Sequence, residues 1–168
     1  VSEFETVEHE ASYTRWLEAR VSASLADAAP SVPHDQVMAE LDSLLDDLAR
    51  NKGLSVVVVT HNEQQKESLY LSMLPIKWRP QARKSLKKIV LYIAERNLPA
   101  ALAMRRRIED AVLPLSEHPY LFRLGRVPGT REVVAHPNYI VMYRVAAGRI
   151  EIVNVVHARQ QFPRSPHE

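Results

Sequence analysis

The chain has 168 residues, room for one ordinary domain or two small ones, and it contains no cysteine, which excludes disulfides, thiolate metal sites and thiol catalysis. No apolar run approaches the roughly 20 residues of a membrane helix, so we expect a soluble, cytoplasmic protein without membrane partners. The net charge of +2 hides an asymmetry: residues 1–72 carry 13 acidic and 5 basic side chains, net −8, and residues 73–168 carry 7 and 17, net +10. The two parts should attract each other, and the basic part alone would attract a polyanion such as nucleic acid.

Two amphipathic helices are predicted in the acidic segment, residues 1–52. Over His9–Ala26 apolar residues recur at three- and four-residue steps, and a second helix begins with Pro33 in its first turn. Two short helices cannot close a core alone, so this segment should fold on another surface or pair with itself. The two apolar stripes comprise Tyr13, Trp16, Leu17, Val21 and Leu25 in the first helix, and Val37, Leu41, Leu44, Leu45 and Leu48 in the second.

Residues 53–72 are interpreted as a junction between two parts of the chain. Gly53 ends the second helix, Leu54–Thr60 is a β-branched run with strand character, and the residues after it are polar without a clear period. At Met73 the composition changes at once from acidic to basic, as at a fresh translation start. We hypothesise that the chain joins two adjacent reading frames, with a second protein over residues 73–168.

A short strand and a helical hairpin are predicted at the start of the basic part. Leu74–Arg79 has strand character, and Pro80 and Pro99 each stand in the first turn of a helix. These helices cover Pro80–Asn97 and Pro99–Leu113, and Pro114 should end the second one. Their inward-facing residues are predicted to be Leu86, Ile89, Ile93, Ile108 and Val112.

Three runs rich in β-branched and aromatic residues follow, at Arg131–His136, Tyr139–Ala146 and Arg149–Val156. The links between them are two residues long, which predicts an antiparallel meander with Val141 and Tyr143 buried. The order of strand, two helices and strands predicts an α+β fold, with the hairpin packed on one face of a small antiparallel sheet.

No motif of phosphate-loop, zinc-protease, serine-hydrolase or dinucleotide-binding enzymes is present, and we expect no cofactor and no metal site. The candidate site residues are cationic groups at strand ends. Arg131 and Arg159 could meet on the sheet rim and bind phosphate or carboxylate through their guanidinium groups. His157 could be a general acid or base near neutral pH, or an ordinary rim residue.

Residues Met73–Pro163 resemble the RelE/ParE superfamily of bacterial toxins. The resemblance rests on GRVPGTREVV, HPNYIVMYRV and IEIVNVVHARQQFP, in that order after two helices, and it implies a helical hairpin on a curved antiparallel sheet. The acidic part, with TRWLEARVSASL and SVPHDQVMAEL, resembles the small all-α antitoxins encoded beside such toxins. The resemblance therefore implies an antitoxin-like segment, residues 1–52, joined to a toxin domain, residues 73–168.

Two activities occur in the superfamily, and they imply different targets. The RelE branch cleaves messenger RNA in the ribosome with basic residues, and on that pattern Arg131 and Arg159 match basic positions and His157 could assist. The central arginine of the pattern falls on Ile140, which can neither stabilise a phosphorane nor orient a 2′-hydroxyl. We therefore favour the ParE branch, associated with inhibition of DNA gyrase. The alternatives are a ribosome-dependent ribonuclease and a module that only binds nucleic acid.

The antitoxin-like segment is expected to neutralise the toxin domain, either within one chain or between the chains of a homo-oligomer. Its apolar stripes should lie on the toxin, and carboxylates such as Asp42, Asp46 and Asp47 should face arginines. The residues predicted to bind the partner are Trp16, Leu17, Val21, Leu41, Leu44 and Leu48 of the segment, and Arg83, Lys87, Arg105 and Arg106 of the toxin domain.

Overall fold

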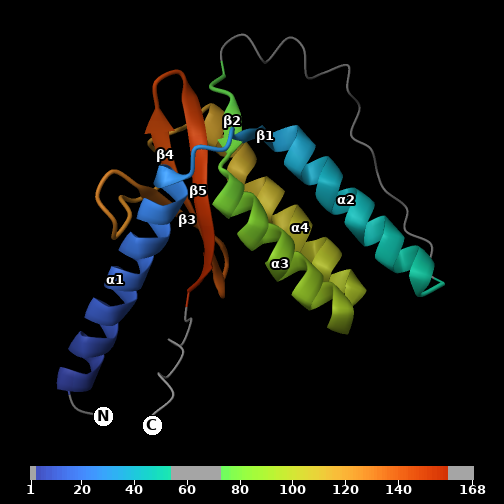
Figure 1. The fold of residues 1–168 in the computed structure, drawn as a ribbon, viewed down its shortest axis with the longest axis horizontal. Coiled ribbons are helices and arrows are strands. Elements are labelled where there is room, and N and C mark those ends of the chain that lie inside the picture. Colours follow the sequence, from blue (N-terminus) through green and yellow to red (C-terminus); the bar gives the residue numbers. More distant parts are fainter. Residues whose placement is uncertain (1–2, 54–72, 159–168) are drawn as a thin grey trace.

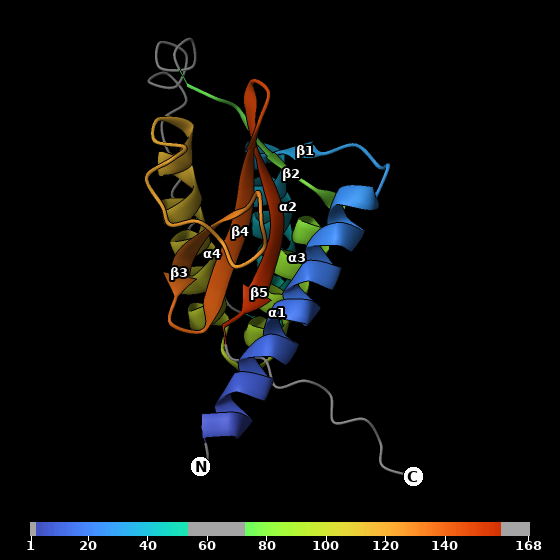
Figure 2. The same ribbon diagram turned by 90° about the vertical axis from the view of Figure 1, so that its left-hand side faces the viewer.

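The computed structural model describes residues 3–53 and 73–158, which form one sheet with helices on both faces (Figures 1 and 2). In these two ranges the chain forms four α-helices, one 3₁₀ helix and five strands. In chain order they are α1 (Glu3–Ala26), β1 (Val32–Pro33), α2 (His34–Asn51), β2 (Ile76–Trp78), α3 (Pro80–Arg96), α4 (Leu98–Val112), the 3₁₀ helix (Leu113–Ser116), β3 (Arg131–His136), β4 (Tyr139–Ala146) and β5 (Arg149–His157).

The strand order is β1-β2-β5-β4-β3, which places β5 at the centre of the sheet. The predicted meander is confirmed, because β4 pairs antiparallel with both β3 and β5. The two-residue turn between β4 and β5 contains Gly148 at φ 69°, a conformation that favours glycine. The sheet is not antiparallel throughout, however, because β2 pairs in parallel with β5. The long connection from β2 to β5, which contains α3, α4, residues 113–130, β3 and β4, makes this possible, since parallel strands need a crossover of about a dozen residues or more.

Helices α3 and α4 pack as a hairpin on one face of the sheet, as predicted (Figure 2). Pro99 lies in the first turn of α4, and the Asn97 side chain caps this helix by accepting a hydrogen bond of 3.0 Å from the Ala100 N–H. The chain leaves α4 at the 3₁₀ helix that contains Pro114. We call the buried cluster on this face the helical core; it contains Leu86, Ile108, Val112, Val141 and Tyr143, and Ile89 and Ile93 pack against it half-buried.

Helix α1 covers the opposite face of the sheet. It runs beside β5 in both views (Figures 1 and 2), and its C-terminal half makes a second buried cluster with the meander. We call this cluster the outer core; it contains Tyr13, Leu17 and Val21 of α1, and Val127, Ile140, Met142, Val153 and Val156. The central strand β5 is therefore buried on both faces, with seven consecutive buried residues from Ile150 to Val156.

Helix α2 packs on the outside of α3 and α4, and its apolar stripe joins the helical core. Two details differ from the predictions. Pro33 precedes the helix, which begins at His34. The segment is also not wholly helical, because Val32 and Pro33 form the two-residue strand β1 on β2. The physical reason is that a residue before proline is driven to extended backbone, and β1 supplies the antiparallel neighbour for the other edge of β2.

Three predictions lie outside the described residues: the strand Leu54–Thr60, nearly all of the junction at residues 53–72, and the position of Arg159. In the described part of the chain, none of the helices combines the length and apolarity needed to cross a membrane.

Candidate functional site

The first candidate interface is the contact between α1 and the outer face of the sheet. Leu17 and Val21, both predicted partner-binding residues, are buried in the outer core, whereas Trp16 is only half-buried at its margin. The Tyr13 hydroxyl donates a hydrogen bond of 3.2 Å to the His157 carbonyl oxygen at the end of β5. The α1 stripe therefore lies on the sheet as expected, with Leu17 and Val21 at its centre.

A single arginine from the basic part holds the C-terminal end of α1. Arg79, directly after β2, donates from Nε to the carbonyl oxygen of Ser24 at 2.8 Å, and from Nη2 to those of Leu25 and Asp27 at 3.2 and 3.0 Å. Carbonyl groups in the last turn of a helix have no partner within the helix and carry partial negative charge, so a guanidinium fits them well. The Ser24 hydroxyl donates to the Val153 carbonyl at 2.7 Å and fixes the register of α1 on β5.

Arg79 is held in turn by Glu151, a fully buried carboxylate of β5. The Arg79 Nη1 lies 3.6 Å from Glu151, and Arg144 and Arg149 bind the same carboxylate at 2.6 and 2.7 Å. Burial alone raises the pKa of Glu151, but the hydrogen bonds and charges of Arg149 and Arg144 outweigh it, so the pKa is lowered. The carboxylate therefore stays ionised at neutral pH and orients Arg79 toward α1.

The second interface joins α2 to the helical hairpin through apolar contacts and ion pairs. Leu41 is buried, Leu44 and Leu48 are half-buried, and Asp42 lies 2.8 Å from Arg105 of α4. Arg105 also pairs with Glu109 on its own helix. Burial raises the pKa of Asp42 despite the nearby charge of Arg105, and the charges of Glu109 and Asp46 raise it further. Of the other two predicted carboxylates, Asp47 pairs with Arg50 inside α2, and Asp46 lies near Asp42.

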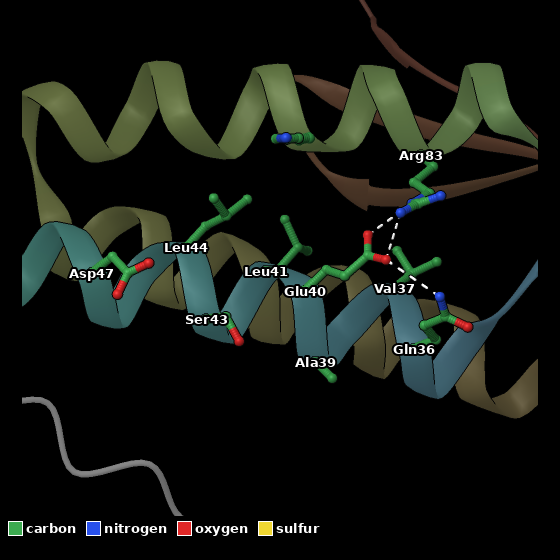
Figure 3. Close-up of a pocket in the computed structure, with 10 residues that line it drawn as sticks. Gln36, Val37, Ala39, Glu40, Leu41, Ser43, Leu44, Asp47 and Arg83 are labelled. Atoms are coloured by element: carbon green, nitrogen blue, oxygen red, sulfur yellow. Dashed lines mark hydrogen bonds and ion pairs between the residues drawn. The ribbon is translucent and has the colours of Figure 1, made fainter.

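At the start of α2, two further contacts reach the basic part. Trp78 of β2 is fully buried, and its Nε1–H donates to Nδ1 of His34 at 3.0 Å. Arg83 of α3 binds the Glu40 carboxylate through Nε and Nη2 at 2.7 and 2.5 Å (Figure 3). Lys87 lines the groove of about 520 Å³ between α2 and α3 shown in Figure 3, and Arg106 is exposed.

Of the predicted rim residues, Arg131 and His157 lie apart, and Arg159 lies outside the described residues. Arg131 begins β3 and stands opposite Tyr143, whereas His157 ends β5 and stands opposite Tyr139. This register separates the two residues by about 15 Å along the strands and about 10 Å across them. The guanidinium of Arg131 is occupied by the loop before β3, where its Nη1 donates to the Phe122 carbonyl at 2.7 Å. Ile140 is buried in the outer core beneath α1.

Sequence reasoning missed a row of rings at the far end of the meander. The Tyr139 ring lies 5.9 Å from the His136 ring and 5.2 Å from the His157 ring, measured between ring centres. The pKa of His136 is lowered, first by burial and then by the charges of Arg107 and His157. The two-residue links of the meander could have revealed this row, since they set His136, Tyr139 and His157 side by side.

Sequence reasoning also missed Arg79, Ser24 and His34, whose importance depends on contacts between distant parts of the chain. Among the described residues, no group of three or more His, Asp or Glu side chains is placed to hold a metal ion.

Comparison with known proteins identifies the two parts of the chain. Residues 76–162, more than half of the chain, match the family described as the ParE toxin of the type II toxin-antitoxin system parDE. The chain belongs to the ParE toxin family. Residues 8–40 match the PaaA2 family, described as a stability determinant. The chain is thus a toxin-antitoxin module, with a ParE-type toxin domain after an antitoxin-like segment.

Relatives of the ParE domain include two curated proteins and one solved structure. The protein named putative toxin Y4kP, from Sinorhizobium fredii, is 39% identical over 95 residues, which span 56% of this chain and 98% of that protein. Toxin RelE2 of Caulobacter vibrioides is 35% identical over 86 residues, 51% of this chain and 97% of that protein. The solved chromosomal ParDE system from P. aeruginosa aligns with a TM-score of 0.45 and 24% identity, covering 50% of this chain and 95% of that one.

The two family matches lie on opposite sides of the interfaces that α1 and α2 make with the rest of the structure. The antitoxin-like match contains most of α1, all of β1 and the first turns of α2, and the ParE match contains the elements from β2 to β5. The contacts of Arg79 with α1 and of Arg83 with Glu40 therefore join the antitoxin-like segment to the ParE domain of the same chain.

Proposed function

We propose that this chain is a self-neutralised ParE-type toxin whose cytoplasmic target is DNA gyrase. In this proposal residues 1–52 are the antitoxin unit, residues 53–72 connect the units, and residues 73–168 are the toxin. The observation that carries the proposal is the burial of Leu17 and Val21 against the outer face of the ParE sheet, with Arg79 closing over the end of α1. Contacts made within a single chain support neutralisation in cis.

Three features support a toxin that acts by binding rather than by cleaving RNA. Ile140 occupies the position of the central basic residue of the ribonuclease pattern, and its side chain is buried under α1. Arg131 is hydrogen-bonded to loop carbonyls. His157 lies at the other end of the sheet from Arg131, so these two residues form no joint acid-base site.

The test requires a full-length chain in which α1 is detached. We define the released variant as Leu17→Asp, which places a carboxylate in the outer core and favours exposure of α1 to water. Glu18→Ala is the matched control, because Glu18 is its exposed neighbour on α1. The released variant should stop growth and inhibit DNA supercoiling by purified gyrase, and the wild type and the control should do neither.

A second variant that detaches α1 controls for the possibility that Leu17→Asp misfolds the protein. Arg79→Gln removes the charged donor to the α1 carbonyls without changing the outer core, and circular dichroism should confirm that both variants retain the helices and the sheet. Release without any effect on gyrase would overturn the gyrase assignment, and a wild-type chain as toxic as the released variant would overturn cis neutralisation.

The ribosome-dependent ribonuclease remains the second candidate, and the row formed by His136, Tyr139 and His157 is the observation that favours it. The two imidazoles, with Arg107 near His136, could supply an acid, a base and a phosphate contact. On this alternative the released variant cleaves ribosome-bound messenger RNA and leaves gyrase unaffected. Adding His157→Ala would then reduce cleavage by about 100-fold or more, whereas toxicity through gyrase would persist.

A further inference from the structure

The loop that leads into β3 exposes three large apolar side chains within five residues. Tyr120, Leu121 and Leu124 are 65%, 66% and 73% exposed, and this holds with α1 and α2 in place. We call residues 120–126 the Tyr120 loop. Single exposed apolar residues are ordinary, whereas a group of them marks an interaction site. The antitoxin-like segment thus leaves an apolar surface of the ParE domain open to solvent.

The backbone of the Tyr120 loop is fixed on both sides. Before it, the Tyr143 hydroxyl donates a hydrogen bond of 2.8 Å to the Pro119 carbonyl, and near its end the Gly125 N–H donates one of 2.8 Å to the Thr130 carbonyl. The fit at Gly125 is close, because a β-carbon there would lie 2.3 Å from the Thr130 hydroxyl oxygen. The loop therefore presents its apolar side chains from a pre-organised backbone, which lowers the ordering cost of binding.

Three arginines lie in or next to the Tyr120 loop, and one of them contacts α1. The guanidinium carbon of Arg131 lies 5.1 Å from the centre of the Tyr120 ring, and that of Arg126 lies 5.1 Å from the Tyr13 ring of α1. Arg123 lies in the same loop; it is exposed and pairs at 3.2 Å with the buried Glu132. An apolar centre with a cationic rim is complementary to an acidic protein surface that contains an apolar pocket.

We propose that the Tyr120 loop is a docking surface for an acidic protein, and that under the proposed function this partner is the target of the toxin. A protein fits this surface better than a nucleic acid, because Leu121 and Leu124 gain nothing from phosphate groups and offer no rings for base stacking. One face of the Tyr120 ring is already occupied by Arg131. The apolar side chains of the loop would thus hold the partner and the arginines would select it by charge. The antitoxin-like segment does not cover this surface.

The experiment uses the full-length released variant as its background, because the wild-type chain is silent under the proposed function. Into it we introduce Leu121→Ser with Leu124→Ser, and separately Tyr92→Ser as the matched control. Tyr92 is exposed on α3 and lies near Tyr139, at the opposite end of β3 from the loop. Binding to purified gyrase is measured at low and high salt, together with growth arrest and binding to a short DNA duplex. The loop variant should bind gyrase at least about tenfold more weakly and lose growth arrest, and the control should keep both.

The outcomes separate this inference from the proposed function. Growth arrest and gyrase binding that survive both loop substitutions overturn the docking surface and leave the proposed function intact. If the released variant arrests growth without binding gyrase, the gyrase assignment is overturned. The docking surface is then judged by growth alone: loss of arrest in the loop variant supports it, and continued arrest overturns it. A loop variant that loses DNA binding but keeps growth arrest and gyrase binding makes the surface a nucleic-acid contact and overturns the inference. A released variant without any growth effect overturns both proposals.

Discussion

The Nε of Arg79, at the end of β2, lies 2.8 Å from the carbonyl oxygen of Ser24 in the last turn of α1. This bond joins the ParE domain to the backbone of the antitoxin-like segment rather than to one of its side chains. Because backbone carbonyls are common to all sequences, Arg79 recognises the end of a helix, and the side chains of Leu17 and Val21 supply the apolar contact.

Replacing Arg79 should loosen α1 selectively. Arg79→Gln removes a charged donor from three carbonyl groups. We expect the free energy that holds α1 on the sheet to fall by about 2–4 kcal/mol, because hydrogen bonds to charged groups contribute about 1.5–3 kcal/mol each and are not additive. Hydrogen exchange of the α1 amides measures the effect in the full chain. Arg83→Gln is the control, because it breaks the pair with Glu40 and should accelerate exchange in α2 instead. Equal protection of α1 in the two variants would contradict the role of Arg79.

The contribution of Glu151 to stability should depend on pH in a defined direction. Its pKa is lowered from an ordinary value of 4.5, so its stabilising effect is present above pH 4.5 and is lost as the pH falls through the folded-state pKa. Urea unfolding of wild type and Glu151→Gln should therefore differ most at neutral pH and converge in acid. The expected difference at neutral pH is about 3–5 kcal/mol, because three arginines lose a buried counter-charge.

Asp47→Asn supplies the baseline for this measurement. Asp47 is an exposed acid that pairs with Arg50 on its own helix, so its replacement should have little effect at any pH. A constant difference between wild type and Glu151→Gln from neutral to acid pH would contradict the assignment.

The apolar stripes of α1 and α2 should contribute unequally to the docking of their helices on the ParE domain. Leu17 is 1% exposed in the outer core, so Leu17→Ala should cost about 2–4 kcal/mol in α1 docking. Leu44 is half-buried on α2, and Leu44→Ala should cost about 1 kcal/mol or less, because much of its surface stays in water. Hydrogen exchange of the α1 and α2 amides measures the two free-energy losses. Equal losses would contradict the expectation that the more deeply buried leucine contributes more.

The two ion pairs of α2 should also differ in strength. Asp42 and Arg105 are 30% and 17% exposed at their side chains, whereas Glu40 and Arg83 are each 38% exposed. Double-mutant cycles to alanine should give a coupling of about 0.5–1 kcal/mol for the more exposed pair and a larger one for Asp42 with Arg105. A larger coupling for Glu40 with Arg83 would reverse the order that solvent exposure predicts.

The meander and the helical hairpin could be predicted because their signals are local. Two-residue links after Ala135-His136 and Val145-Ala146 leave antiparallel pairing as the only option, and Pro80 and Pro99 mark the helix starts. The parallel pairing of β2 with β5 is a contact between distant segments, and no local residue signals it. The position of α1 did have a signal, because the nearly continuous apolar run of β5 is typical of a strand buried on both faces.

The candidate site was only partly predictable. The stripes of α1 and α2 follow from helical periodicity, and Leu17, Val21 and Leu41 are buried as expected. Arg79 resembles any residue before a helix in the sequence, since its acceptors are carbonyl groups of a helix about 55 positions earlier. The separation of Arg131 from His157 required the register of three strands, which the sequence defines only once the turns are known.

The central position of β5 in the sheet determines when, during synthesis of the chain, the ParE domain can finish folding. A ribosome makes α1 and α2 before any part of the ParE domain, and the sheet cannot close until β5, its middle strand and the last described element, has been made. Under the proposed function the inhibitor is therefore already present on the same polypeptide when the toxin completes its fold, so the association of the two units is intramolecular. The ratio of inhibitor to toxin at birth is fixed at one to one. A cell that carries this chain would then be poisoned through damage to the inhibitor, and not through unequal synthesis of two partners.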